Sequence, residues 1–160
     1  MREWVGLLAR LVVGGVWIVA GALKLPDPAQ SVNAVRAYQL LPGELVQPVG
    51  QLLPVIEIVI GLCLVLGLLT RWMAAASAVL FVLFIIGIAS AWARGITIDC
   101  GCFGGGGYDP DAADKYPWEI ARDAALLLVS LFLVWKPSTR LALDSQLFRR
   151  TPEPLEPQGT

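Results

Sequence analysis

Four apolar stretches of about 20 residues each divide the chain and constrain its fold more than any other feature. They cover about residues 4–25, 48–69, 72–93 and 117–135. About 20 apolar residues are needed for a helix to cross a bilayer. Because lipid offers the backbone no hydrogen-bond partners, each stretch must satisfy its own amides as a helix. The sequence therefore predicts an all-α fold, a polytopic membrane four-helix bundle within residues 1–136, followed by a polar, flexible tail at 137–160.

Composition supports this setting and excludes several functions. Hydrophobic residues make up 56% of the chain and charged residues 16%, which is low for a soluble domain. The net charge of −1 and the lack of a basic run predict no nucleic-acid partner. The chain has no histidine, and two neighbouring thiolates would fill only half of a zinc site, so we expect no metal. Gly14 and Gly15 are small enough to let a second helix approach the first.

The basic residues predict an orientation in the membrane. Six of them flank one set of helix ends, namely Arg2, Arg71, Lys136, Arg140, Arg149 and Arg150. Four flank the other set, namely Lys24, Arg36, Arg94 and Lys115. Since cytoplasmic ends carry the excess of Lys and Arg, both termini are expected in the cytoplasm. The connections at about 26–47 and 94–116 then lie on the extracytoplasmic face.

The first of these connections contains a short helix signal. Asp27 is a suitable N-cap and Pro28 suits the first helical position. The apolar side of this helix is expected to carry Ala29, Val32, Val35 and Leu40. We expect it to lie in the membrane interface between the first two crossing helices and to end before Pro42-Gly43. A surface helix with only a packing role is the alternative.

The second connection, the loop at 94–116, carries Cys100-Gly101-Cys102, followed by Phe103 and four glycines. A disulfide across so short a loop would be strained, which makes it labile and oxidising rather than structural. The glycines leave the backbone free to bend, and the loop is expected to lie outside the helix contacts. Cys100 and Cys102 are therefore predicted to be a redox pair; tight packing of two small residues, or half of a metal site, remain alternatives. Cys63 lies within a crossing helix and is expected to be a buried small hydrophobe.

Charged side chains inside the apolar stretches form a second candidate cluster. Ionised groups are costly in lipid and normally face the interior in pairs. Lys24 and Glu57 both fall in the extracytoplasmic half, so we predict that they pair. Arg122 and Asp123 follow the cysteine loop; being adjacent on a helix, only one of them should face the interior. A cation near the cysteines would favour the thiolate, while an ion-pair network that only aligns the helices is the alternative.

Four segments resemble the MauE/DoxX-like group of small bacterial membrane proteins. They are AGALKLPDP at 20–28, AYQLLP at 37–42, LPVIEIVIGLCLVLG at 53–67 and DCGCFG at 99–104. The resemblance spans about residues 4–135 and implies a four-helix protein of the bacterial cytoplasmic membrane. In the MauE branch it implies maturation of disulfide-rich periplasmic proteins alongside thioredoxin-like partners. The matching polar positions are Lys24, Asp27, Tyr38, Glu57, Asp99, Cys100 and Cys102.

Together these features predict a membrane-embedded thiol–disulfide redox component, with Cys100 and Cys102 as the exchanging residues. The supporting polar residues are Lys24, Glu57, Asp99, Arg122 and Asp123. The expected partner is a thioredoxin-like or disulfide-bearing extracytoplasmic protein. The sequence identifies no electron acceptor, and a quinone is one candidate. The alternative is a non-enzymatic accessory subunit of a larger respiratory or oxidoreductase complex in the membrane. A transporter, the weakest interpretation, lacks inverted repeats and broken helices.

Overall fold

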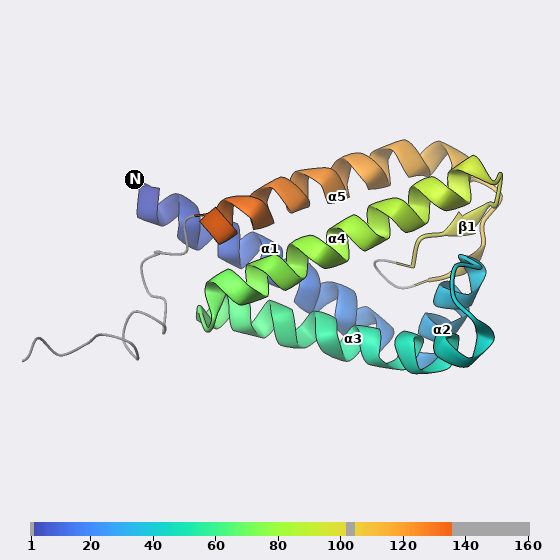
Figure 1. The fold of residues 1–160 in the computed structure, drawn as a ribbon, viewed down its shortest axis with the longest axis horizontal. Helices are drawn as coiled ribbons and strands as arrows, with labels where there is room; N and C mark the ends of the chain where they lie inside the picture. The colour runs from blue at the N-terminus through green and yellow to red at the C-terminus, as the bar shows by residue number, and fades with distance from the viewer. Residues whose placement is uncertain (1, 102–104, 136–160) are drawn as a thin grey trace, which may run out of the picture.

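The computed structural model describes residues 2–101 and 105–135, most of which are helical. Four helices contain 23 or 24 residues each: α1 (Arg2–Lys24), α3 (Gly43–Leu66), α4 (Thr70–Ala93) and α5 (Ala112–Trp135). The shorter α2 (Pro28–Ala37) lies across one end of the molecule. Beside it, β1 (Ile98–Asp99) and β2 (Gly107–Tyr108) form a small antiparallel pair, which the sequence did not predict. The start of α1 and the end of α5 lie together at the opposite end (Figure 1).

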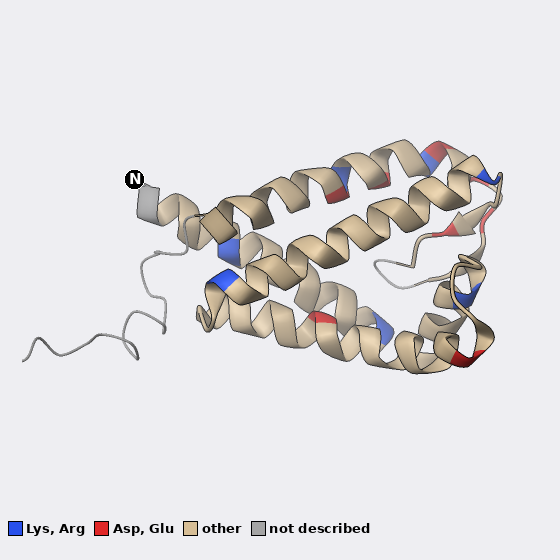
Figure 2. Ribbon diagram, in the orientation of Figure 1, with Lys and Arg blue, Asp and Glu red and all other residues tan. Residues whose placement is uncertain are grey.

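Three helices in the described part of the chain are long and apolar enough to cross a membrane. They are α1 from Trp4, α3 and α4. Charged residues are sparse along these helices and gather mainly near their ends (Figure 2). Large apolar side chains point outward instead, with Leu8 59%, Val59 50% and Leu83 57% exposed. Such a continuous apolar surface marks a contact with lipid or with another protein.

α5 has the length of a crossing helix, about 36 Å for 24 residues, but carries more charge. Its first half contains Glu119, Arg122 and Asp123. It begins at Ala112 instead of about residue 117, and α3 begins at Gly43 instead of about 48. Both helices thus start more than a turn before the proline at which the predicted apolar stretch begins. Membrane helices tolerate such prolines because neighbouring groups satisfy the freed carbonyls. The predicted tail at 137–160 lies outside the described residues.

The long helices pack as two pairs, α1 with α3 and α4 with α5, with less contact between the pairs. Along the α1–α3 interface the backbones nearly touch. A Cβ on Gly14 would lie 2.8 Å from the carbonyl oxygen of Gly61, and a Cβ on Gly61 would lie 2.7 Å from that of Gly14. Gly15, by contrast, faces open space. Of the two predicted contact glycines, only Gly14 has that role.

The α4–α5 interface is held by hydroxyl groups. Ser77 Oγ lies 3.1 Å from Ser130 Oγ, and Ser130 donates to the carbonyl oxygen of Leu126 at 2.9 Å. Trp17 of α1 reaches across and donates its Nε1–H to Ser77 Oγ at 2.7 Å. All three polar side chains are buried, so this chain of hydrogen bonds connects the two helix pairs at the centre of the molecule.

A buried arginine closes the far end of the α1–α3 pair. Arg10 has no exposed surface and donates from Nε to the Leu64 carbonyl at 2.9 Å and from Nη2 to the Val65 carbonyl at 3.1 Å. The last carbonyls of a helix lack partners within the helix and carry partial negative charge. The guanidinium gives these carbonyls hydrogen-bond donors and a positive charge. This explains how Arg10, which was not predicted to be buried, is accommodated between the helices.

Candidate functional site

α2 begins as predicted. Asp27 is its N-cap and accepts a hydrogen bond from the amide of Gln30 at 3.1 Å. Of the four residues predicted on its apolar side, Val32 is buried and Val35 is half-buried, while Ala29 and Leu40 are exposed, and Leu40 lies after the end of the helix. The buried residues of the helix are Ser31, Val32 and Ala34. These residues are buried because α2 packs against α3 and against the cysteine loop. The spacing of the apolar residues in α2 does not reveal either contact.

Cys100 is buried, with 6% of its surface exposed, directly after β1. It packs with Ile88 of α4 and with Ala112 and Tyr116 of α5. The Tyr38 hydroxyl donates to the Cys100 carbonyl at 2.8 Å. The expectation that the cysteine loop lies outside the helix contacts was therefore wrong at Cys100, because the chain turns inward between the ends of α4 and α5.

Glycines fix the described part of the loop in place instead of leaving it free to bend. Gly101 has a φ of +65° and its amide donates to Asp99 Oδ1 at 2.8 Å. A Cβ on Gly101 would lie 2.8 Å from the Cβ of Ala34, and one on Gly106 only 2.5 Å from it. Glycine is needed here both for the positive φ and for this close approach to α2. Cys102 lies outside the described residues, so its predicted pairing with Cys100 stays a prediction.

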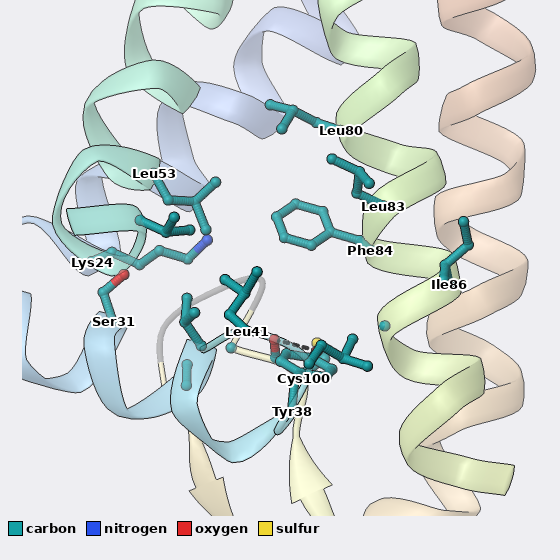
Figure 3. Close-up of a pocket in the computed structure, with 16 residues that line it drawn as sticks. Lys24, Ser31, Tyr38, Leu41, Leu53, Leu80, Leu83, Phe84, Ile86 and Cys100 are labelled. Atoms are coloured by element: carbon teal, nitrogen blue, oxygen red, sulfur yellow. Dashed lines mark hydrogen bonds between the residues drawn. The ribbon is translucent and has the colours of Figure 1, made fainter. Parts of the chain in front are cut away.

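An apolar cavity of about 380 Å³ lies between α2, α3, α4 and the cysteine loop. Its polar lining consists of Lys24, Ser31, Tyr38 and Cys100, and leucines make up much of the rest (Figure 3). Cys63 lies on α3, half-buried and outside this lining. A volume of this size is typical of a small-molecule site.

Lys24 and Glu57 form the predicted ion pair beside the cavity. Lys24 Nζ lies 2.6 Å from Glu57 Oε1, with 5% of the lysine side chain and none of the glutamate side chain exposed. The ammonium is also 5.6 Å from the centre of the Phe84 ring, and it points into the cavity (Figure 3). Glu57 Oε2 has no hydrogen-bond partner among the described residues. An ammonium has three donors, so a ligand in the cavity can accept from it while Glu57 holds it in place.

Arg122 and Asp123 pair with each other, which the sequence did not predict. Arg122 Nη2 lies 2.9 Å from Asp123 Oδ1. As predicted, only one of the two is deeply buried: 3% of the Asp123 side chain is exposed, against 24% for Arg122.

The acidic group in contact with the cysteine is Glu119, a residue that sequence reasoning missed. Its carboxyl group lies beside the Cys100 thiol, which can donate a hydrogen bond to a carboxylate. The sequence analysis considered a cation beside the cysteines, whereas the ionisable neighbour of the Cys100 thiol is a carboxyl group. One signal was available, since Glu119 precedes Asp123 by four residues and so shares its helix face. Such a carboxylate can accept the thiol proton.

Tyr116 fastens the strand that precedes Cys100. Its hydroxyl accepts from the amide of Ile98 at 2.9 Å and donates to the carbonyl of Ile96 at 2.7 Å. Nearby, Lys115 donates to Asp109 at 2.6 Å, and this hydrogen bond lowers the pKa of the Asp109 carboxyl.

Comparison with known proteins supports the resemblance to MauE. The family described as "Methylamine utilisation protein MauE" matches residues 2–136. A curated relative from Methylophilus methylotrophus, named methylamine utilization protein MauE, is 39% identical over 99 residues, 61% of this chain and 52% of the relative. The protein of the same name from Methylorubrum extorquens is 37% identical over 114 residues, 70% of this chain and 59% of the relative.

A third relative of that name, from Paracoccus denitrificans, is 33% identical over 98 residues, 61% of this chain and 53% of the relative. The chain thus spans little more than half the length of these curated relatives. No solved structure matches the chain. The comparisons give no specific support to the wider DoxX-like group. Because the family match runs through all five helices and the cysteine loop, the chain belongs to the MauE family.

Proposed function

We propose that this chain is a membrane-embedded thiol–disulfide component that helps to mature an extracytoplasmic protein of methylamine utilisation. In this proposal α1, α3, α4 and α5 all cross the bacterial cytoplasmic membrane as a four-helix bundle. The start of α1 and the end of α5 lie at one end of the molecule, as an even number of crossings requires. The excess of basic residues at that end favours a cytoplasmic location for it. α2 then lies at the extracytoplasmic interface with the cysteine loop.

The observation that carries the redox proposal is the position of Cys100, buried at the cavity wall with the Glu119 carboxyl beside its thiol. Thiol–disulfide exchange requires a thiolate, so a reactive cysteine needs a proton acceptor within reach. Glu119 supplies one at a site where 6% of the cysteine surface is exposed. Asp99 contributes by fixing the turn through the Gly101 amide.

The exchange starts from Cys100 and Cys102 joined as a disulfide. A client thiolate attacks one of the two sulfurs, which breaks their bond and forms a mixed disulfide. The second client thiolate then attacks the client sulfur of that bond. The client leaves with a new disulfide, and the chain keeps both electrons as two thiols. Because Cys100 is buried, we assign the attack by the client to Cys102, and Cys100 then leaves as the thiolate.

The test uses cells in which each cysteine is replaced in turn and counts the disulfides of the client by alkylation and mass spectrometry. Cys100→Ser and Cys102→Ser should each abolish client oxidation, while the matched control Cys63→Ala should retain most of it. Since Cys100 packs against two helices, the amount of each variant in the membrane is measured as well. Cys100→Ala is included because it keeps a small apolar group there.

Glu119→Gln gives a second readout that does not depend on removing a sulfur. It keeps the shape of the side chain but cannot accept the thiol proton as a base, so client oxidation should slow while the protein stays in the membrane. Full client maturation by both cysteine variants would instead support a non-enzymatic accessory subunit. In the proposed orientation, a membrane-impermeant thiol reagent added outside should also label reduced Cys102.

A further inference from the structure

The cavity beside Cys100 opens between the two helix pairs, where an apolar molecule could enter from the bilayer. Several residues that line it are also exposed on the outer surface of the molecule: Leu40 50%, Leu41 38%, Leu83 57% and Ile86 55%. Leu83 and Ile86 belong to α4, a helix long and apolar enough to cross the membrane. In the proposed membrane setting these side chains face lipid or the lipid–water interface, so the cavity is accessible to lipid-soluble compounds.

The cavity nevertheless contains one strong polar feature. The Lys24 ammonium points into it (Figure 3), and the buried Glu57 holds this ammonium at 2.6 Å. Keeping charged groups in such a place is costly, and intramembrane charges commonly mark a functional site. A ligand that suits the cavity therefore has a largely apolar body and at least one oxygen that accepts a hydrogen bond from an ammonium.

We propose that the cavity binds the head group of a lipid-soluble quinone, which accepts electrons from the reduced cysteine pair. This inference rests on the proposed function, because a pair that oxidises clients must itself be reoxidised. The chemistry balances without a further reagent: the two thiols form one disulfide and lose two electrons and two protons. The quinone takes up two electrons and two protons and becomes a hydroquinone.

The residues around the cavity have defined roles in this step. Glu119 takes the proton of Cys100, which frees the thiolate to react. Lys24 donates to one quinone oxygen and stabilises the negative charge that develops there during reduction. The Phe84 ring, which also lines the cavity, offers an apolar face to the quinone ring. Tyr38 holds the Cys100 backbone at the cavity wall.

Binding is tested first, with the purified full chain in lipid nanodiscs and decylubiquinone as the probe. Val49→Trp and Val55→Trp form a matched pair, since both valines lie on α3 and are 38% and 47% exposed. Only Val49 lines the cavity. Wild type and Val55→Trp should bind the quinone saturably, and Val49→Trp should weaken binding at least tenfold. Leu83→Trp, which lines the cavity, and Val82→Trp, which does not, repeat the comparison on α4.

The head group is tested against the tail. Decylbenzene has an apolar chain of the same length and a ring without carbonyl oxygens, so it should bind at least tenfold more weakly than decylubiquinone. Equal binding of the two compounds would show a site for acyl chains and overturn the proposal. Absence of saturable quinone binding, or equal effects of Val49→Trp and Val55→Trp, would overturn it as well.

Electron transfer is tested second, without any client. Reduced wild-type protein mixed with decylubiquinone should lose two thiols for each hydroquinone formed, whereas Val49→Trp should react at least tenfold more slowly. Binding without thiol loss would overturn the proposal. Failure of the proposed function would be seen separately: protein oxidised chemically with diamide would then leave the client thiols unchanged, although its cysteines still reacted with the quinone.

Discussion

The two helix pairs achieve close packing by opposite means. In the α1–α3 pair, side chains are absent where the backbones meet, and a buried ion pair stands beside the contact. In the α4–α5 pair, Ser77 and Ser130 fill the interface and exchange weaker, uncharged hydrogen bonds. The α1–α3 contact should therefore be sensitive to a larger residue at Gly14 or Gly61 and to the loss of either charge of the ion pair. The cavity lies between α3 and α4, which belong to different pairs and pack less closely against each other.

The largest loss of stability should follow from breaking the Lys24–Glu57 ion pair between α1 and α3. Glu57→Gln or Lys24→Met leaves one buried charge without its partner, which costs about 3–5 kcal/mol of unfolding free energy for a buried pair. The double variant should lose less than the sum of the two single losses, because no charge is left unpaired. Denaturant unfolding of the protein in detergent measures this. Additive single effects would mean that the two residues stabilise the protein independently.

Adjacent glycines should separate the α1–α3 contact from ordinary helix effects. Gly14→Ala places a methyl group 2.8 Å from the Gly61 carbonyl, so we expect a loss of about 1–3 kcal/mol from overpacking. Gly15→Ala meets no atom within 4 Å and should leave stability unchanged, or raise it by up to about 1 kcal/mol through helix propensity. The same unfolding assay compares them. Similar losses in both variants would remove the argument for a glycine contact.

The α4–α5 pair should respond more mildly. Ser130→Ala removes one of the partners of Ser77 and should cost about 1 kcal/mol, the usual net value of a neutral hydrogen bond. Ser77→Ala should cost more than Ser130→Ala because it also leaves the buried Trp17 Nε1–H without its acceptor. Thermal unfolding of both variants tests the order. A larger loss for Ser130→Ala would show that the Trp17 contact adds nothing.

The smallest effect is expected away from both helix interfaces, at the exposed pair Asp109 and Lys115. The hydrogen bond from Lys115 lowers the pKa of Asp109, so it adds to stability above the carboxyl's unfolded pKa. That contribution is lost as the pH falls through the lower, folded pKa. Because the pair lies at the surface, Lys115→Met should raise the Asp109 pKa, measured by NMR, and barely change the unfolding midpoint. A clear drop in that midpoint at neutral pH would contradict the surface assignment.

Features that depend on one segment or on a strong energetic penalty could be predicted from the sequence. The apolar stretches indicated the long helices because their length matches a bilayer. Asp27 could be assigned as an N-cap because its role depends only on the next few residues. Lys24 and Glu57 could be paired because an unpaired charge at that depth costs so much that few arrangements remain.

Features that depend on how the helices are rotated could not be predicted. Gly14 and Gly15 are equivalent in the sequence, and only the packing of α1 distinguishes them. The contact of Glu119 with Cys100 requires α5 to begin before Pro117 and the loop to turn inward. The burial of Cys100 could not be predicted either. A glycine-rich sequence looks the same whether the loop is flexible and exposed or packed closely against a helix.

The position of Arg10 has a consequence for synthesis of the protein. Its guanidinium is satisfied by the carbonyls of Leu64 and Val65, so α1 cannot settle as a finished crossing helix until α3 has been made. The chain emerges from the ribosome N-terminus first. A nascent chain that has reached Leu66 already contains these carbonyl acceptors for Arg10, and Glu57 for Lys24. The α1–α3 pair can therefore leave the insertion machinery with Arg10 and Lys24 already bound to their acceptors, before α4 and α5 follow.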